Sequence, residues 1–195
     1  MREGVEFDVP AARRVTLSER AFGSVARTVT PQGVLAIGHR AEAAMGDALA
    51  AARAARWPLV VLDGLQDPGN VGTVCRTAAA AGAPAFAVLE GSADPFGAKA
   101  VRASGGTVLR LLVARGRWTD LAQVPGWGAA AAGGVPWDRA DLAGAPLVAF
   151  GGEAHGLRRD DLQLVTIPMA AGVESLNVAA AAAVVLFEIR RRLEA

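Results

Sequence analysis

Three polar segments of the chain contain side chains that could take part in catalysis or ligand binding. Each segment lies next to a short apolar run in the sequence. They span residues 63–77, residues 150–157, and residues 167–169 with 174–178. Their amide, carboxylate and guanidinium groups can orient a substrate, bind phosphate and stabilise developing charge. Their glycines allow close approach of the backbone to a ligand. The sequence therefore predicts one site assembled from three loops.

Strands must position these segments, because short apolar runs alternate with helix-forming stretches along the chain. Loops that follow parallel strands meet at one edge of a sheet, where open α/β sheets bind ligands. The pattern predicts an α/β fold with a mostly parallel sheet flanked by helices. The expected strands are residues 34–37, 59–62, 85–89, 108–113, 128–131, 147–150 and 164–167.

Helices are expected where a capping residue precedes a run of strong helix formers. A glycine favours the end of a helix, and a proline disfavours helix at the residue before it. Arg190, Arg191 and Arg192 suit the negative end of the last helix dipole. The expected helices run from Ser18 towards Thr28, over residues 41–56, from Asn70 through Arg76 to Gly82, and over about 175–193.

The composition is that of a compact globular protein, with 52% hydrophobic and 20% charged residues among 195. The longest apolar stretch is shorter than the roughly 20 residues of a membrane span, and residues 1–10 lack the features of a signal peptide. We therefore expect a cytoplasmic protein with no membrane partner. The single cysteine, Cys75, excludes an intrachain disulfide, and no metal site is predicted. A principal domain is expected over residues 33–195, after a short N-terminal appendage over residues 1–32.

The three segments resemble the motifs of the SpoU (TrmH-like) class of the knotted RNA methyltransferase superfamily in their order, spacing and residue identities, over roughly residues 32–193. Each segment alone is weakly specific, whereas all three in order are highly specific. The resemblance implies a deep trefoil knot near the C-terminus, S-adenosylmethionine as the cofactor, and a homodimer formed through the last helix. It implies methyl transfer to a ribose 2′-hydroxyl of a structured RNA. Residues 28–33 resemble a junction in ribosomal RNA members, which favours 23S rRNA over tRNA.

The resemblance also assigns roles to residues by position. One set surrounds the reacting ribose, a second binds the cofactor, and a third, less specific set faces RNA. The catalytic set is Arg76, Asn70, Glu153, Ser175 and Asn177; the cofactor set is Gly151, Gly152, Ile167, Pro168, Met169, Ser175 and Leu176; the RNA set is Arg76, Lys99, Arg102 and Ser104.

Arg76 carries the main chemical hypothesis. The family is thought to use an arginine at this place for deprotonation, but a guanidinium with a pKa above about 12 hardly ever loses its proton. We therefore favour a fixed cation that stabilises the developing alkoxide and grips a phosphate, while a phosphate oxygen or water accepts the proton. Simpler interpretations stay open: Asn70 and Ser175 as helix caps, and Glu153 with His155 as a surface turn.

Two other classes of function also stay open. A nucleotide-binding dehydrogenase would need a GxGxxG turn after its first strand, and the chain has none there. An RNA-binding or dimerisation module of the same fold without methyltransferase activity would not need Asn70, Arg76, Glu153 and Asn177. The net charge of +1 gives no global argument for nucleic acid, so an RNA partner has to be argued from local charge.

Overall fold

The computed structural model describes residues 1–5, 13–26, 30–39, 42–152 and 155–195. The chain divides into two compact units, Met1–Arg40 and Ala41–Ala195. The first unit contains helix α1 (Glu19–Val25), which the Ser18 hydroxyl caps as predicted. The strand predicted at residues 34–37 was wrong, since these described residues form no strand. An apolar run becomes a strand only where another strand pairs with its backbone groups.

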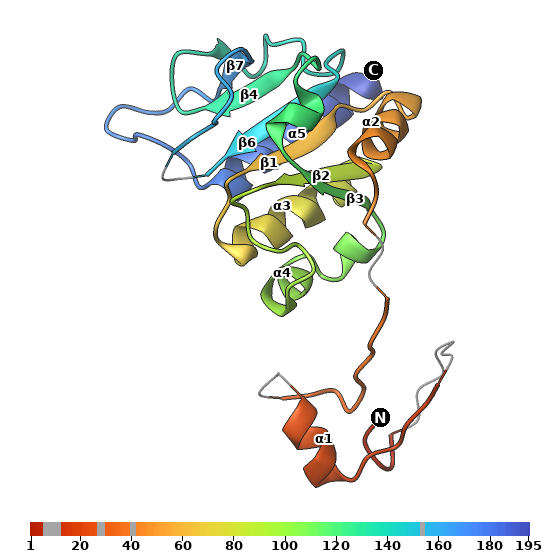
Figure 1. The fold of residues 1–195 in the computed structure, drawn as a ribbon. Helices are drawn as coiled ribbons and strands as arrows, with labels where there is room; N and C mark the ends of the chain where they lie inside the picture. Colours follow the sequence, from red (N-terminus) through yellow and green to blue (C-terminus); the bar gives the residue numbers. More distant parts are fainter. Residues whose placement is uncertain (6–12, 27–29, 40–41, 153–154) are drawn as a thin grey trace. The chain divides into compact units, whose positions relative to one another are not determined.

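Seven parallel strands form one sheet in the second unit, in the order β3-β2-β1-β6-β4-β7-β5 (Figure 1). The predicted α/β fold with a parallel sheet is thereby confirmed. Most of the predicted strands agree with the structure within one residue at either end. The strands are β1 (Leu59–Asp63), β2 (Ala85–Leu89), β3 (Leu112–Gly116), β4 (Trp127–Ala130), β5 (Val135–Pro136), β6 (Leu147–Gly151) and β7 (Gln163–Thr166).

The strand predicted at residues 108–113 is displaced in the structure. A 3₁₀ turn, η1 (Thr107–Leu109), occupies its first half, and β3 begins only at Leu112. Gly105 and Gly106 both have positive φ, which forms a turn that any other residue would adopt only with strain. Leu112 pairs with Ala85 of β2, so pairing within the sheet sets the start of the strand. The two-residue strand β5 was not predicted because it is too short to show a pattern.

Helices cover both faces of the sheet, and they are α2 (Met45–Ala54), α3 (Pro68–Ala81), α4 (Ala98–Ala103) and α5 (Val178–Leu193). Val60 and Leu62 of β1 belong to the core that includes residues of α3 and α5. The alternate residues Leu59 and Val61 belong to the core that includes residues of α2. The side chains of one strand thus fill two cores, as expected for a parallel sheet buried on both faces. Within the described residues no helix has both the length and the apolar character that crossing a membrane requires.

Helix α3 begins two residues before its predicted cap. The Asp67 carboxylate accepts hydrogen bonds from the amides of Gly69 and Asn70 at 3.2 and 3.3 Å, so Asp67 is the N-cap. Pro68 occupies the first helical position, where its fixed φ suits the helix and its missing N–H costs nothing. Asn70 as cap was therefore wrong. The helix ends as predicted at Gly82, which is left-handed with a φ of 100°.

Helix α5 begins at Val178, three residues later than predicted. Asn177 is its N-cap, since its side-chain oxygen accepts from the Ala179 amide at 2.9 Å. Ser175 lies outside the helix and is exposed, so the reading of Ser175 as a cap was wrong. The cap thereby places a predicted catalytic residue at the start of α5, whose first two residues, Val178 and Ala179, are buried.

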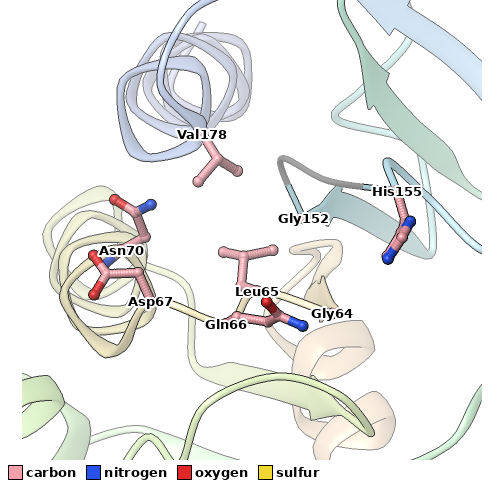
Figure 2. A pocket seen from close by; sticks show the side chains of 8 residues that line it. All are labelled: Gly64, Leu65, Gln66, Asp67, Asn70, Gly152, His155 and Val178. Atoms are coloured by element: carbon pink, nitrogen blue, oxygen red, sulfur yellow. The ribbon is translucent and has the colours of Figure 1, made fainter.

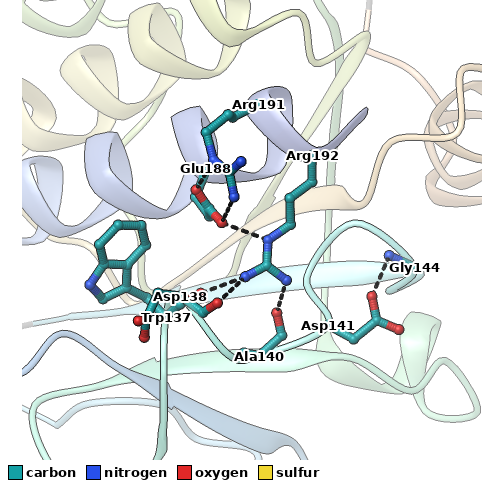
Figure 3. Close-up of polar contacts among 8 residues, drawn as sticks. All are labelled: Trp137, Asp138, Ala140, Asp141, Gly144, Glu188, Arg191 and Arg192. Carbon is teal, nitrogen blue, oxygen red and sulfur yellow. Dashed lines mark hydrogen bonds and ion pairs between the residues drawn. The ribbon is translucent and has the colours of Figure 1, made fainter. Parts of the chain in front are cut away.

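Buried Glu188 anchors the other end of α5 (Figure 3). Arg191 donates two hydrogen bonds to its carboxylate at 2.8 Å, and Arg192 donates a third at 2.6 Å. Arg192 also donates to the carbonyl oxygens of Ala140 and Asp138 at 2.5 and 2.6 Å. The hydrogen bonds from Arg191, and then the one from Arg192, lower the pKa of Glu188 from 4.5 to about 2. Arg192 therefore ties α5 to the segment that follows β5.

Candidate active site

The loops that follow β1 and β6 meet the start of α5 in one pocket of about 260 Å³. The two strands are parallel neighbours in which Asp63 pairs with Gly151, so their loops leave the sheet side by side at its carboxyl edge. In Figure 2, Asp67, which caps α3, and Asn70 in its first turn lie across the hollow from Gly152 and His155. All three polar segments therefore contribute to one pocket. Its lining residues are Gly64, Leu65, Gln66, Asp67, Asn70, Gly152, His155 and Val178.

Hydrogen bonds hold the three segments together around this pocket. The Gly152 amide donates to the carbonyl oxygen of Asp63 at 2.9 Å, which joins the second segment to the first. The Asn177 side-chain nitrogen donates to the side-chain oxygen of Asn70 at 3.2 Å, which joins the third segment to the first. Because the Asn177 oxygen already caps α5, its amide can turn only one way towards Asn70. Asn70 and Asn177 are thus oriented by the fold.

Gly151 and Gly152 lie in close contact with other backbone segments of the chain. A methyl group at Gly152 would overlap the carbonyl oxygen of Gly64, and one at Gly151 would overlap the backbone of Gly156. Any larger residue at either position would force the loops apart. These glycines therefore allow close approach between two backbone segments of the chain, whereas the sequence predicted close approach of the backbone to a ligand.

Arg76 lies on α3, six residues beyond Asn70 and so roughly 9 Å further along the helix axis. Its side chain is exposed and does not line the pocket. It lies against the turn at Gly105, where a Cβ atom would be 3.7 Å from the guanidinium carbon. The arginine therefore lies outside the pocket, against the turn that follows α4, and its side chain is exposed.

Two of the residues predicted to face RNA are exposed, on the short helix α4. The Lys99 ammonium group donates to Asp67 at 2.5 Å, and both side chains are about half exposed. This hydrogen bond is the main cause of the lowered pKa of Asp67. Arg102 is also exposed. Lys99 is thereby tied to the cap of α3, next to the pocket.

Ser104 is completely buried, unlike the other residues of the predicted RNA set. Its hydroxyl donates to the carbonyl oxygen of Val101 at 2.8 Å and accepts from the Gly106 amide at 3.2 Å. These bonds use the hydroxyl within the chain, so direct contact with RNA does not follow from this position. We instead assign Ser104 to shaping the turn against which Arg76 lies.

The remaining cofactor candidates lie in the loop between β7 and α5, which follows a strand of the same sheet (Figure 1). Ile167 is partly buried against the core, and Met169 is half-buried. Pro168, Ser175 and Leu176 are exposed. None of these five lines the pocket itself. Glu153, predicted to be catalytic, lies outside the described residues.

Sequence reasoning missed several residues of the pocket. His155 was interpreted as part of a surface turn, yet it lines the hollow opposite α3. Leu65, Gln66 and Asp67 also line it, although only Asn70 and Arg76 were singled out from their segment. Their position in a polar loop directly after a buried strand was the available signal. A second recess of about 580 Å³, which includes Arg117, opens where β2 and β3 end and was not predicted.

Comparison with known proteins places this site in a family. The chain matches the SpoU rRNA Methylase family over residues 58–187, which is more than half of its length. The chain belongs to the SpoU rRNA methylase family. The resemblance of its motifs to this family is thereby confirmed.

Individual relatives agree with this membership. The chain is 35% identical over 185 residues to the 23S rRNA (guanosine(2553)-2'-O)-methyltransferase RlmP of Bacillus subtilis, covering 89% of this chain and 71% of the relative. It is 37% identical to the 23S rRNA (guanosine-2'-O-)-methyltransferase RlmB of Xanthomonas axonopodis, over 76% and 65% of the two chains. The crystal structure of an AdoMet-bound rRNA methyltransferase from Sinorhizobium meliloti superposes with a TM-score of 0.79 at 31% identity, covering 91% and 71%.

Proposed function

We propose that this SpoU family member transfers a methyl group from S-adenosylmethionine to a ribose 2′-hydroxyl of RNA, in 23S rRNA in preference to tRNA. The observation that carries the proposal is the meeting of the three family motifs in one pocket. Two relatives bear the names of 23S rRNA guanosine 2′-O-methyltransferases, which supports this substrate. A ribosomal RNA substrate also supports the predicted cytoplasmic location.

The residues present fit S-adenosylmethionine. Gly151 and Gly152 leave no side chain at the end of β6, and the loop of residues 167–177 exposes the apolar side chains of Val173 and Leu176 by 50% and 39%. Burying such apolar groups against an adenosyl moiety is favourable. When bound, the cofactor supplies a methyl group on a positively charged sulfur that is open to in-line displacement. The proposed contacts are Gly151, Gly152, Ile167, Pro168, Met169, Ser175 and Leu176.

Asn70 and Asn177 are proposed to orient the ribose. Their amides are held by each other and by the start of α5, and amide groups can both donate to and accept from a hydroxyl. Holding reactants in line contributes roughly 7 kcal/mol or more to lowering a barrier of this kind. We place Ser175 and Glu153 in the same group, because both adjoin segments that reach the pocket.

Arg76 is proposed to act as a fixed cation. Its exposed guanidinium can stabilise the negative charge that develops on the ribose oxygen and can grip a neighbouring phosphate. A phosphate oxygen or water then takes the hydroxyl proton. Lys99 and Arg102 on α4 extend this positive surface for the RNA backbone, and Lys99 can exchange Asp67 for a phosphate.

The proposed active form is a homodimer joined through α5. Phe187 is 48% exposed on this helix, and the exposed Ala180 and half-exposed Val184 lie on the same face at helical spacing. An apolar stripe of this kind is suited to packing against a second copy. A deep trefoil knot near the C-terminus, and a short N-terminal appendage over residues 1–32 that is reduced relative to the family's RNA-binding domain, complete the proposal by resemblance to the family.

Calorimetry and methyl transfer test the proposal together. We expect S-adenosylmethionine to bind with measurable heat, NAD to show none, and tritiated methyl groups to enter 23S rRNA in preference to tRNA. Binding of S-adenosylmethionine without methylation of either RNA would leave a non-catalytic module of the same fold. Binding of NAD alone would refute the methyltransferase and favour a dehydrogenase.

A further inference from the structure

An ion pair between the buried carboxylate of Asp63 and the half-exposed side chain of Arg158 adjoins the pocket, and no motif had joined these two residues. Asp63 ends β1 and is completely buried. Arg158 donates to one carboxylate oxygen through its backbone amide and to the other through its side-chain Nε, both at 2.6 Å, and its Nη2 lies 2.5 Å from that second oxygen. One residue thus satisfies both oxygens of a carboxylate that has no access to water.

The same Asp63 holds the floor of the pocket through its backbone. Its carbonyl oxygen accepts the hydrogen bond from Gly152, and Gly152 in turn lies against the carbonyl oxygen of Gly64. Gly64 and Gly152 both line the pocket, on facing loops (Figure 2). Rotation of Asp63 would therefore move both sides of the pocket floor.

Arg158 extends this connection to a third loop. Its guanidinium donates to the carbonyl oxygen of Glu90, which follows β2. A Cβ atom at Gly91 would lie 3.3 Å from its Nη1, and one at Gly64 would lie 3.9 Å from its Nε. The planar group thus fills the space between the loops after β1 and β2, while its own backbone belongs to the loop after β6.

We propose that Asp63 and Arg158 are positioning residues for methyl transfer, which hold Gly64 and Gly152 at the spacing that the cofactor and the ribose require. This proposal rests on the proposed function. Neither residue has to touch a substrate. A misplacement of about 1 Å by residues remote from the reacting atoms can cost on the order of a hundredfold in rate, so a rigid connection behind the pocket has a catalytic consequence.

The test compares Arg158→Lys with Arg159→Lys. Arg159 is the neighbouring control, because its side chain also binds a carboxylate and a backbone carbonyl, those of Asp161 and Leu121, and neither residue lines the pocket. Lysine keeps the charge but cannot span Asp63 and Glu90 together. We expect Arg158→Lys to weaken S-adenosylmethionine binding about 10- to 100-fold, by analogy with the loss seen when the hydrogen-bond partners of metal ligands are removed. Arg159→Lys should leave the affinity unchanged while lowering Tm at least as much.

Two further measurements separate the possible outcomes. Asp63→Asn should show the same loss of affinity, and if that variant does not fold, Arg158→Gln replaces it. Wild-type affinity and turnover in Arg158→Lys would overturn the positioning role while leaving the proposed function intact. Failure of the unmodified protein to bind S-adenosylmethionine would instead remove the proposed function, and this proposal with it.

Discussion

Replacing Glu188 by glutamine should destabilise the protein in a way that depends on pH. The carboxylate is buried and accepts three hydrogen bonds from Arg191 and Arg192, which lower its pKa from 4.5 to about 2. A shift of this size corresponds to about 3 kcal/mol of stability, at about 1.4 kcal/mol for each pKa unit. Because the pKa in the folded state is depressed, this contribution is complete above about pH 5 and is lost as pH falls towards 2.

Urea unfolding followed by circular dichroism between pH 7 and pH 2 measures this effect. We expect Glu188→Gln to lower the free energy of unfolding by about 3 kcal/mol at pH 7, with the difference from wild type shrinking towards zero near pH 2. Glu194→Gln is the control, because Glu194 is 61% exposed and pairs with Arg190 at the surface. A difference for Glu188→Gln that stays constant from pH 7 to pH 2 would refute the assignment of this stability to the ionised carboxylate.

Three other variants test the pocket, the cation and the dimer. Gly152→Ala should weaken S-adenosylmethionine binding about tenfold or more in calorimetry, through steric strain of roughly 1–3 kcal/mol, whereas Gly46→Ala, with open space around it, should not. Arg76→Lys should lower kcat about a hundredfold or more with S-adenosylmethionine affinity retained, and near-normal turnover would end that role; exposed Arg53→Lys on α2 is its control. Phe187→Glu should convert a dimer into a monomer by light scattering, and an unchanged mass would place the interface elsewhere.

The sheet could be predicted from the sequence because parallel strands buried on both faces read as short apolar runs. β1 and β2 are buried at every residue and were found to within one residue. Residues 34–37 have the same apolar character but no neighbouring strand, and β3 begins only where it pairs with β2. Composition cannot distinguish these cases, since pairing depends on partners far away in the sequence.

The sequence predicted which loops form the site, but it predicted less well which residues of those loops line the pocket. Asn70 and Asn177 lie 107 residues apart, and only the family resemblance predicted that they share a site; the structure joins them by a hydrogen bond. Two cap assignments failed because several residues near each helix start can cap about equally well, and the oxygens of Asp67 and Asn177 are the ones that accept from the free amides. The burial of Ser104 depends on the packing of the turn before β3, and no local pattern reports it.

The position of the transferred methyl group tests the central claim most directly. Alkali cleaves RNA through the free ribose 2′-hydroxyl, so a nucleotide methylated on that oxygen stays joined to its neighbour. After incubation of 23S rRNA with the protein and tritiated S-adenosylmethionine, followed by alkaline hydrolysis, we expect the label in resistant dinucleotides. Label released in mononucleotides would place the methyl group on a base and would contradict a pocket that presents a ribose to the methyl donor.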